Sequence, residues 1–131
     1  MVIDTHVLFW WLTDNEQLSP TARDFMNSCE AGEQHCVLSG VSLWELEHKR
    51  RKGRLSLSNP VRTWLPKLQQ LEFVELTGTS VDLWLSAAEL AWTHRDPADR
   101  LIAATALAHD VSLLTKDRRF HASDSPVSAV W

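Results

Sequence analysis

Five acidic residues in this chain either follow apolar runs or begin predicted helices, where carboxylates can meet at one edge of a sheet. They are Asp4, Glu45, Asp96, Asp99 and Asp117. If the preceding strands are parallel neighbours, their carboxyl ends lie together, at the edge where open α/β sheets bind ligands. Carboxylates at close quarters raise one another's pKa and require cations, and hard divalent ions such as Mg²⁺ or Mn²⁺ prefer oxygen ligands. The pattern therefore indicates a metal-dependent enzyme that acts on phosphate esters.

Each acid on its own also has a structural explanation. Asp4 at a strand end is a suitable cap for the next helix. Ser42 and Glu45 have the spacing of a capping box, in which the Glu side chain reaches back to the cap residue. Asp96 suits an N-cap, and Asp99 would complement the dipole of the same helix. Both interpretations stay open for each residue, but the joint arrangement favours a shared site.

Strands and helices that alternate along the chain must position these acids. Capping residues, Pro and Gly stops, and apolar periodicity predict helices over 7–12, 20–32, 42–53, 60–70, 80–92 and 97–109. Short apolar runs predict strands over 1–5, 35–39, 73–76, 111–115 and 127–130. The connections are too long for hairpins, so we predict a mainly parallel sheet with helices on both faces. Residues 1–131 are expected to form one α/β domain.

Composition restricts the class of protein. The chain has 131 residues, of which 44% are hydrophobic and 23% charged, as in an ordinary globular domain. Its apolar run over 7–12 is far below the roughly 20 residues of a membrane span, and no signal peptide is recognisable, so we expect a cytoplasmic protein without membrane contact. Cys29 and Cys36 lack metal-motif spacing and are expected to be buried free thiols.

The basic residues are unevenly distributed. The formal net charge of −4 argues against general nucleic-acid binding through overall charge. Two basic clusters nonetheless follow candidate metal acids, at 49–54 and at 116–119. They either form solvated faces or supply cations to a phosphate bound at the carboxylates. We expect the phosphate contacts to come from Lys49, Arg50, Lys116 and Arg118.

The motifs together resemble the PIN-domain ribonucleases, and most closely the VapC-type toxins of bacterial toxin–antitoxin pairs. They span nearly the whole chain in the order and spacing of that family. The segments that carry the resemblance are Ile3-Asp4-Thr5-His6-Val7-Leu8-Phe9-Trp10, Ser42-Leu43-Trp44-Glu45-Leu46, Lys49 with Gly53-Arg54-Leu55, His94-Arg95-Asp96-Pro97-Ala98-Asp99-Arg100-Leu101-Ile102-Ala103, and Leu114-Thr115-Lys116-Asp117. The chain departs from the usual pattern at Glu47, His48 and Ala98, which bears on substrate choice and partner fit.

The resemblance implies a PIN-like fold and an endoribonuclease that uses Mg²⁺, with Mn²⁺ as a substitute, to hydrolyse RNA phosphodiester bonds by metal-activated water. It implies a catalytic and metal-binding quartet of Asp4, Glu45, Asp99 and Asp117, with Asp96 as an additional acid of open role. Thr5 and Thr115 are expected to orient these groups. Without metal the cluster should be electrostatically strained, and Asp117→Asn should relieve the repulsion.

The resemblance also implies partners. VapC-like toxins form homodimers and are inhibited by a cognate antitoxin, through which alone they contact DNA. The chain has seven Trp residues, more than one small core easily uses, and large aromatic side chains favour interface centres. We expect an antitoxin tail to pack near Trp10, Trp11 and Trp44 and to send an Arg or Lys toward Asp4 and Asp99.

Two other classes of function are compatible with parts of the pattern. A phospho-acceptor signalling domain also gathers acids at strand ends with a Thr and a Lys nearby. It requires a lone Asp at the end of a central strand, and no predicted mid-chain strand ends in one. A non-catalytic RNA-binding or interaction module would retain RNA in the presence of EDTA and after loss of Asp99.

Overall fold

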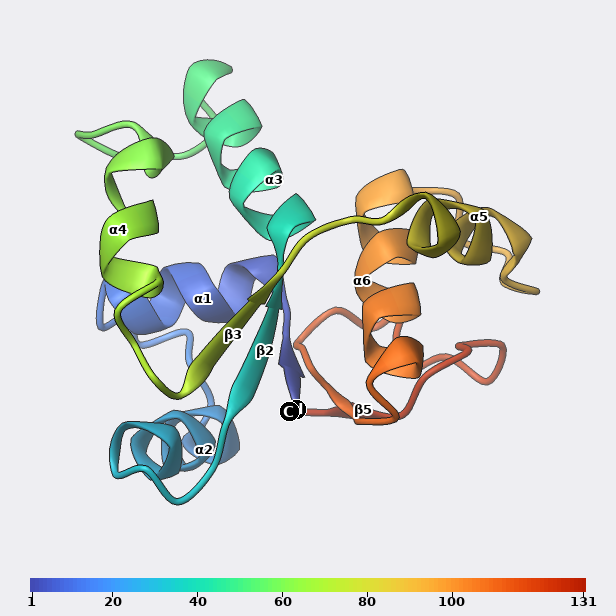
Figure 1. Ribbon diagram of the computed structural model, residues 1–131, viewed down its shortest axis with the longest axis horizontal. Helices are drawn as coiled ribbons and strands as arrows, with labels where there is room; N and C mark the ends of the chain where they lie inside the picture. The colour runs from blue at the N-terminus through green and yellow to red at the C-terminus, as the bar shows by residue number, and fades with distance from the viewer.

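The computed structural model describes residues 1–131 and is built on one five-stranded sheet with the order β3-β2-β1-β4-β5 (Figure 1). The strands are β1 (Val2–Ile3), β2 (Cys36–Ser39), β3 (Val74–Thr77), β4 (Leu113–Leu114) and β5 (Ala129–Val130). All four pairings are parallel, which confirms the predicted parallel sheet. After β3 the chain crosses to the other side of β1, so β1 and β4 flank the switch point where α/β sheets bind ligands.

Helices cover both faces of the sheet (Figure 1). They are α1 (Thr5–Leu12), α2 (Pro20–Glu30), α3 (Gly40–Arg51), a 3₁₀ turn (Val61–Thr63), α4 (Leu65–Leu68), α5 (Val81–Glu89) and α6 (Pro97–Ala108). In Figure 1, α1, α2 and α4 lie on one side, α5 and α6 lie on the other, and α3 contacts both α1 and α6. None of these helices combines the length and apolar character that a membrane span requires.

Alternation along the strands divides the core into two apolar clusters. Ile3 and Leu114 face the cluster formed with α1 and α2, while Val2 and Leu113 face the cluster formed with α6. Successive strand residues point to opposite faces, so strands of two apolar residues bury side chains on both sides. Both cysteines, Cys29 and Cys36, are buried in the first cluster.

The helix predicted to be capped by Ser42 begins earlier, directly after β2. Ser39 is its N-cap and Gly40 its first residue, so the predicted cap position of Ser42 is wrong. Ser42 is instead buried inside the helix, and its Oγ has no hydrogen-bond partner. The early start depends on close packing, because a Cβ on Gly40 would lie 3.2 Å from the Thr77 carbonyl oxygen.

Two other predicted helices are shorter than expected. The helix predicted over 60–70 is divided into the 3₁₀ turn and α4, with Pro66 in the first turn of α4. Pro66 lacks an N–H and its ring excludes a continuous helix from the preceding turn, which explains the division. The helix predicted over 80–92 ends at Glu89, and Leu90, with φ −53° and ψ 126°, is no longer helical.

A single side chain, that of Arg100, caps the C-terminal end of α5. The Arg100 guanidinium donates to the carbonyl oxygens of Ala87, Ala88, Leu90, Trp92 and His94 over 2.7–3.1 Å. All five N–H groups of the guanidinium are therefore used, and they satisfy carbonyls that have no helical partner. Arg100 thus holds the irregular segment 90–94 against α6.

Candidate active site

The adjacent ends of β1 and β4 bring Asp4 and Thr115 together at the switch point. Asp4 is the N-cap of α1, and the Thr5 N–H donates to its Oδ1 at 2.5 Å. Thr115 Oγ1 donates to Asp4 Oδ2, also at 2.5 Å, and both residues are buried. Asp4 is therefore both a helix cap and a candidate ligand, and the Thr115 hydroxyl holds its carboxylate in place.

Glu45 reaches the same region from α3. Its Oε2 accepts a 2.7 Å hydrogen bond from Thr5 Oγ1, and its Oε1 lies 2.5 Å from Lys49 Nζ. The capping-box interpretation is wrong, because α3 begins at Gly40 and Glu45 lies beyond its first turn. Thr5 links Glu45 to the N-terminus of α1, next to Asp4.

Asp96 and Asp99, three residues apart, have different surroundings. Asp96 is exposed, and its Oδ1 accepts from the Ala98 N–H at 2.9 Å as the N-cap of α6. Asp99 is buried in the first turn, with its Oδ2 2.5 Å from His94 Nε2. The structure thus places Asp99 within the cluster and engages Asp96 as a helix cap.

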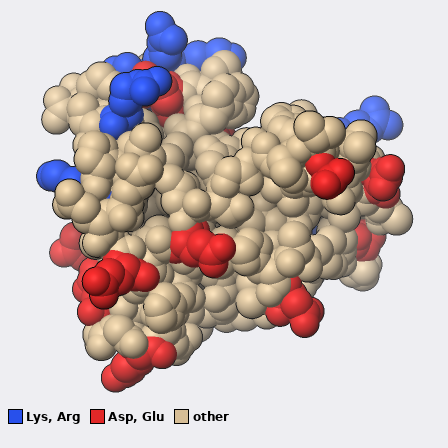
Figure 2. Space-filling view, in the orientation of Figure 1, with Lys and Arg blue, Asp and Glu red and all other residues tan.

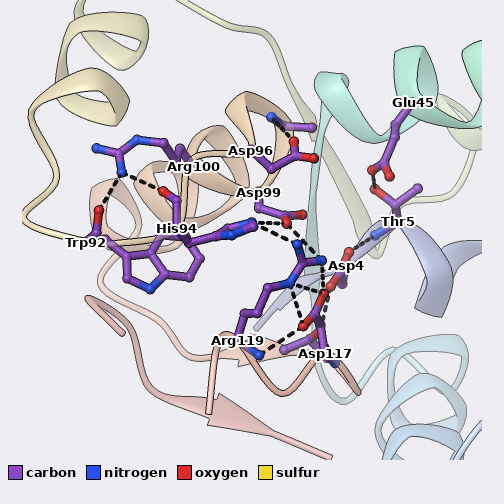
Figure 3. A network of polar contacts seen from close by, with 12 residues as sticks. Asp4, Thr5, Glu45, Trp92, His94, Asp96, Asp99, Arg100, Asp117 and Arg119 are labelled. Carbon is purple, nitrogen blue, oxygen red and sulfur yellow. Dashed lines mark hydrogen bonds and ion pairs between the residues drawn. The ribbon is translucent and has the colours of Figure 1, made fainter. Parts of the chain in front are cut away.

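Asp117 follows β4 and is held by Arg119. Arg119 Nε lies 3.0 Å from both Asp117 carboxylate oxygens, and Nη2 forms an ion pair with the same carboxylate. Nη2 also lies 3.2 Å from Asp99 Oδ2, so Arg119 joins the two acids (Figure 3). The Asp117 N–H donates to Thr115 Oγ1 at 3.0 Å, which ties this turn to Asp4 through one hydroxyl.

Burial disfavours the charged forms of the two innermost carboxylates, those of Asp4 and Asp99. Desolvation raises the pKa of Asp4 to about 6, and the nearby charges of Glu45 and Asp117 add to the rise. Desolvation likewise raises the pKa of Asp99 to about 6, partly offset by the His94 hydrogen bond. Acids close enough to raise one another's pKa favour a cation in their midst.

A neutral His6 side chain lies beside Asp4. Desolvation lowers the pKa of His6 to about 4. The His6 Nε2 accepts a 2.9 Å hydrogen bond from the Lys116 N–H, which leaves the proton on Nδ1, 3.4 Å from Asp4 Oδ2. Neutral His6 therefore contacts Asp4 without compensating its charge.

Asp117 differs from the other two aspartates. The hydrogen bonds from Arg119 lower the pKa of Asp117. Asp117→Asn would therefore remove the favourable contact with Arg119 as well as the repulsion that Asp117 exerts on Asp4, and whether it relieves strain stays a prediction. The electrostatic strain lies at Asp4 and Asp99.

The donor set fits a hard divalent cation, although the side chains do not form a ready coordination sphere. Four carboxylates from four segments converge on the carboxyl edge of the sheet, and oxygen donors suit Mg²⁺ and Mn²⁺. No three acidic, His or Cys side chains are arranged to hold one ion together. Basic side chains engage these acids instead, since the Arg119 guanidinium contacts Asp99 and Asp117 and Lys49 pairs with Glu45.

The basic side chains expected to contact phosphate are not equally available. Arg50 donates to both Glu47 carboxylate oxygens at 2.7–2.9 Å, so it is committed to α3 and is a poor candidate. Lys49 pairs with Glu45, while Lys116 bonds Gln17 Oε1 at 2.8 Å above the Trp10 ring. Arg118 is exposed. Figure 2 shows basic atoms gathered over the far end of α3, whose last turn holds His48, Lys49, Arg50 and Arg51.

The three tryptophans proposed for an antitoxin surface have separate surroundings. Trp10 packs with His6 and Trp131, at ring-centroid distances of 4.6 and 5.8 Å. Trp11 donates to Glu30 Oε1 at 3.0 Å. Trp44 is 59% exposed and lines a pocket of about 280 Å³ with Trp84, Pro97 and Leu101.

Three residues of the site have no predicted role. Arg119 and His94 contact the acids, and Arg100 holds the segment that carries His94. His94 and Arg100 lie in the motif segment that surrounds Asp99, which is the one signal that could have identified them. Arg119 lies two residues from Asp117, but an arginine at this spacing from an aspartate is often solvated, so the spacing alone does not identify the contact.

Comparison with known proteins agrees with this fold. The family model of the PIN domain matches residues 1–125. The chain therefore belongs to the PIN domain family. It is 34% identical over 134 residues to Ribonuclease VapC22 of Mycobacterium tuberculosis, covering 100% of this chain and 98% of that protein.

Solved structures share the fold at lower identity. A toxin–antitoxin complex from Klebsiella pneumoniae matches with a TM-score of 0.64 and 19% identity, covering 99% of this chain and 95% of that one. VapBC2 from Rickettsia felis, bound to a DNA fragment from its promoter, matches with a TM-score of 0.63 and 17% identity, covering 99% and 98%. At these identities the similarity concerns the fold alone.

Proposed function

We propose that this chain is a Mg²⁺-dependent endoribonuclease and the toxin of a toxin–antitoxin pair. The observation that carries the proposal is the carboxylate cluster. In it, Asp4 and Asp99 are buried and their pKa values are raised, and Glu45 and Asp117 lie beside them. Family membership and the relative named Ribonuclease VapC22 support the choice of RNA as substrate.

The chain's own residues would prepare the site for hydrolysis. Asp4, Glu45, Asp99 and Asp117 would hold the divalent ion, and Asp96 would keep α6 in place as its cap. When bound, Mg²⁺ or Mn²⁺ supplies Lewis-acid activation of water and stabilises charge on the phosphate. Thr115 and Thr5 fix the orientations of Asp4 and Glu45, whereas Asp99 and Asp117 would have to exchange their Arg119 contacts for the metal.

The cations beside the cluster would bind the RNA backbone. Lys116 and Arg118 extend from the segment after β4, and Lys49 lies on the side of α3. Because the net charge is −4, binding depends on this local group rather than on overall charge. We expect affinity to be modest and to fall steeply with salt.

RNA cleavage tests the enzymatic part directly. Purified chain should cleave a labelled single-stranded RNA in Mg²⁺ or Mn²⁺, and EDTA should abolish the reaction reversibly. RNA that is retained but uncut in Mg²⁺ would contradict the proposal and favour a binding module. A stable aspartyl-phosphate formed with a small phosphodonor would favour a signalling domain.

We also propose that the chain acts as a homodimer and is inhibited by a small antitoxin, which would supply any DNA contact. The solved neighbours include a toxin–antitoxin complex and a VapBC2 complex on promoter DNA, which supports this assignment. The antitoxin tail would pack near Trp10 and Trp11, or beside Trp44, and direct an Arg or Lys to Asp4 and Asp99.

Co-purification with the protein of the neighbouring reading frame tests the partner. The complex should be inactive, and replacement of the inserted basic residue should restore cleavage even if the complex persists. An equally active nuclease within the intact complex would contradict this model.

A further inference from the structure

Arg119 extends into the carboxylate cluster and contacts two of the acids to which the proposed function assigns the metal (Figure 3). Its Nε lies 3.0 Å from each Asp117 carboxylate oxygen, and its Nη2 pairs with Asp117 and lies 3.2 Å from Asp99 Oδ2. The Arg119 N–H also donates to Asp117 Oδ1 at 2.9 Å. One cation of the chain thus bridges an acid on α6 and an acid after β4.

The oxygens that Arg119 contacts are those that a divalent ion would need. Both Asp117 oxygens are engaged, and Asp99 Oδ2 is shared between Arg119 and His94, 2.5 Å away. A guanidinium has five donors and no acceptor, and it stays charged in proteins, so Arg119 cannot become a metal ligand. An ion that binds between Asp99 and Asp117 must therefore displace it.

The position of Arg119 allows that displacement. Its side chain is 52% exposed, compared with 11% for Asp99 and 23% for Asp117. Partly exposed ion pairs contribute little net free energy, because water and salt screen them. The guanidinium can therefore turn toward solvent while the two acids stay in place.

We propose that Arg119 is an internal competitor for the metal site, which neutralises Asp99 and Asp117 in the metal-free protein and is displaced when a divalent cation binds. The inference rests on the proposed assignment of these acids as metal ligands. It gives one reason why the acids converge without forming a coordination sphere. The metal affinity of the wild type is then set partly by the strength of an arginine contact.

Metal titration of matched variants tests the proposal. Isothermal titration with Mn²⁺ should compare wild type, Arg119→Gln, Arg119→Lys and the neighbouring control Arg118→Gln. At pH 8, above the pKa of about 6 at Asp4 and Asp99, protons do not mask the result. We expect Arg119→Gln to bind Mn²⁺ at least about fivefold more tightly, and Arg118→Gln to stay within about twofold of wild type. Arg119→Lys should fall between wild type and Arg119→Gln, since it keeps the charge but loses the planar fork.

The Arg119 Nε–H resonance of the wild type gives a second measurement that needs no variant. It should shift and exchange faster with solvent when Mg²⁺ is added. Equal Mn²⁺ affinities for wild type and Arg119→Gln, or an unchanged Nε–H signal at saturating Mg²⁺, would overturn the competitor role alone. Absence of Mn²⁺ binding in every protein would overturn the metal-site assignment and this proposal together.

Discussion

The carboxylate cluster and the Glu47–Arg50 pair use the same residue types with opposite results. Glu47 accepts from Arg50 and from the Val61 N–H, and the Arg50 hydrogen bonds lower its pKa to about 2. Asp4 has two hydrogen-bond donors but is buried, and its pKa rises to about 6. Full compensation at a half-buried position ties α3 to the following loop, whereas deeper burial with partial compensation leaves a site that attracts a cation.

Asp117 lies between these two cases. It belongs to the cluster by position, but Arg119 compensates it as Arg50 compensates Glu47. The cluster therefore has a strained inner pair, Asp4 and Asp99, and a compensated member, Asp117. Substitutions at these positions separate the two kinds of acid.

The largest expected effect is the loss of catalysis at the inner pair. Asp4→Asn and Asp99→Asn each remove a hard anionic ligand and should reduce Mg²⁺-dependent RNA cleavage by about 100-fold or more while the fold remains. Single-turnover cleavage rates measure the loss, and circular dichroism checks the fold. The matched control is Asp96→Asn, three residues from Asp99, which should be mild because Asn also caps helices. A rate above about a tenth of wild type for either inner variant would contradict the ligand assignment.

Metal binding should depend on pH in a defined window. Asp4 and Asp99 have pKa values of about 6, and a metal requires both to be deprotonated. Mn²⁺ affinity should therefore fall as pH decreases from 7 through 6, by up to about 100-fold per pH unit if both protons are released, and level off above about 7. Calorimetry in buffers of different ionisation enthalpy measures the protons released. A pH-independent affinity between 5 and 7 would show that these two acids do not bind the metal.

In the metal-free protein, substitution of Asp4 should change the free energy of unfolding in the opposite direction from substitution of Asp117. A raised folded-state pKa means that the stability contribution of Asp4 is present below about pH 4 and is lost as pH rises through about 6. Asp4→Asn avoids this loss and should raise the free energy of unfolding by about 1 kcal/mol at pH 7.5, with the gain vanishing near pH 4. Asp117→Asn removes a favourable pair and should lower it at pH 7.5. Urea denaturation at both pH values distinguishes these outcomes; stabilisation by Asp117→Asn would restore the repulsion hypothesis.

The smallest effect is expected at the Glu47–Arg50 pair. Glu47→Gln weakens a half-buried surface pair and should lower the melting temperature slightly, more at low salt than at high salt. Its RNA cleavage rate should stay within about twofold of wild type, because Glu47 faces Arg50 and Val61 rather than the cluster. A large loss of cleavage would mean that the α3 tether also controls the site.

The sequence predicted the parts of the molecule that depend on local pattern. Apolar runs followed by Asp4 and Asp117 identified β1 and β4, and long connections predicted their parallel pairing. Arg119 could not be placed, because the sequence does not show which side chain turns toward a neighbouring acid. The start of α3 was missed because the backbone of Gly40 lies close to the Thr77 carbonyl oxygen, a contact between α3 and β3 that the sequence does not show. The break before α4 had a local signal in Pro66, which the prediction of one helix over 60–70 did not take into account.

Arg100 gives the segment 90–94 an unusual dependence on one side chain. Five carbonyl oxygens between Ala87 and His94 bond to a single guanidinium, so these contacts form or break together. The segment should therefore open as one cooperative unit in native-state hydrogen exchange, with a free energy below that of global unfolding. Opening would carry His94 away from Asp99 while leaving the sheet intact. The local breathing of this segment is thereby coupled to the ionisation of a carboxylate in the cluster.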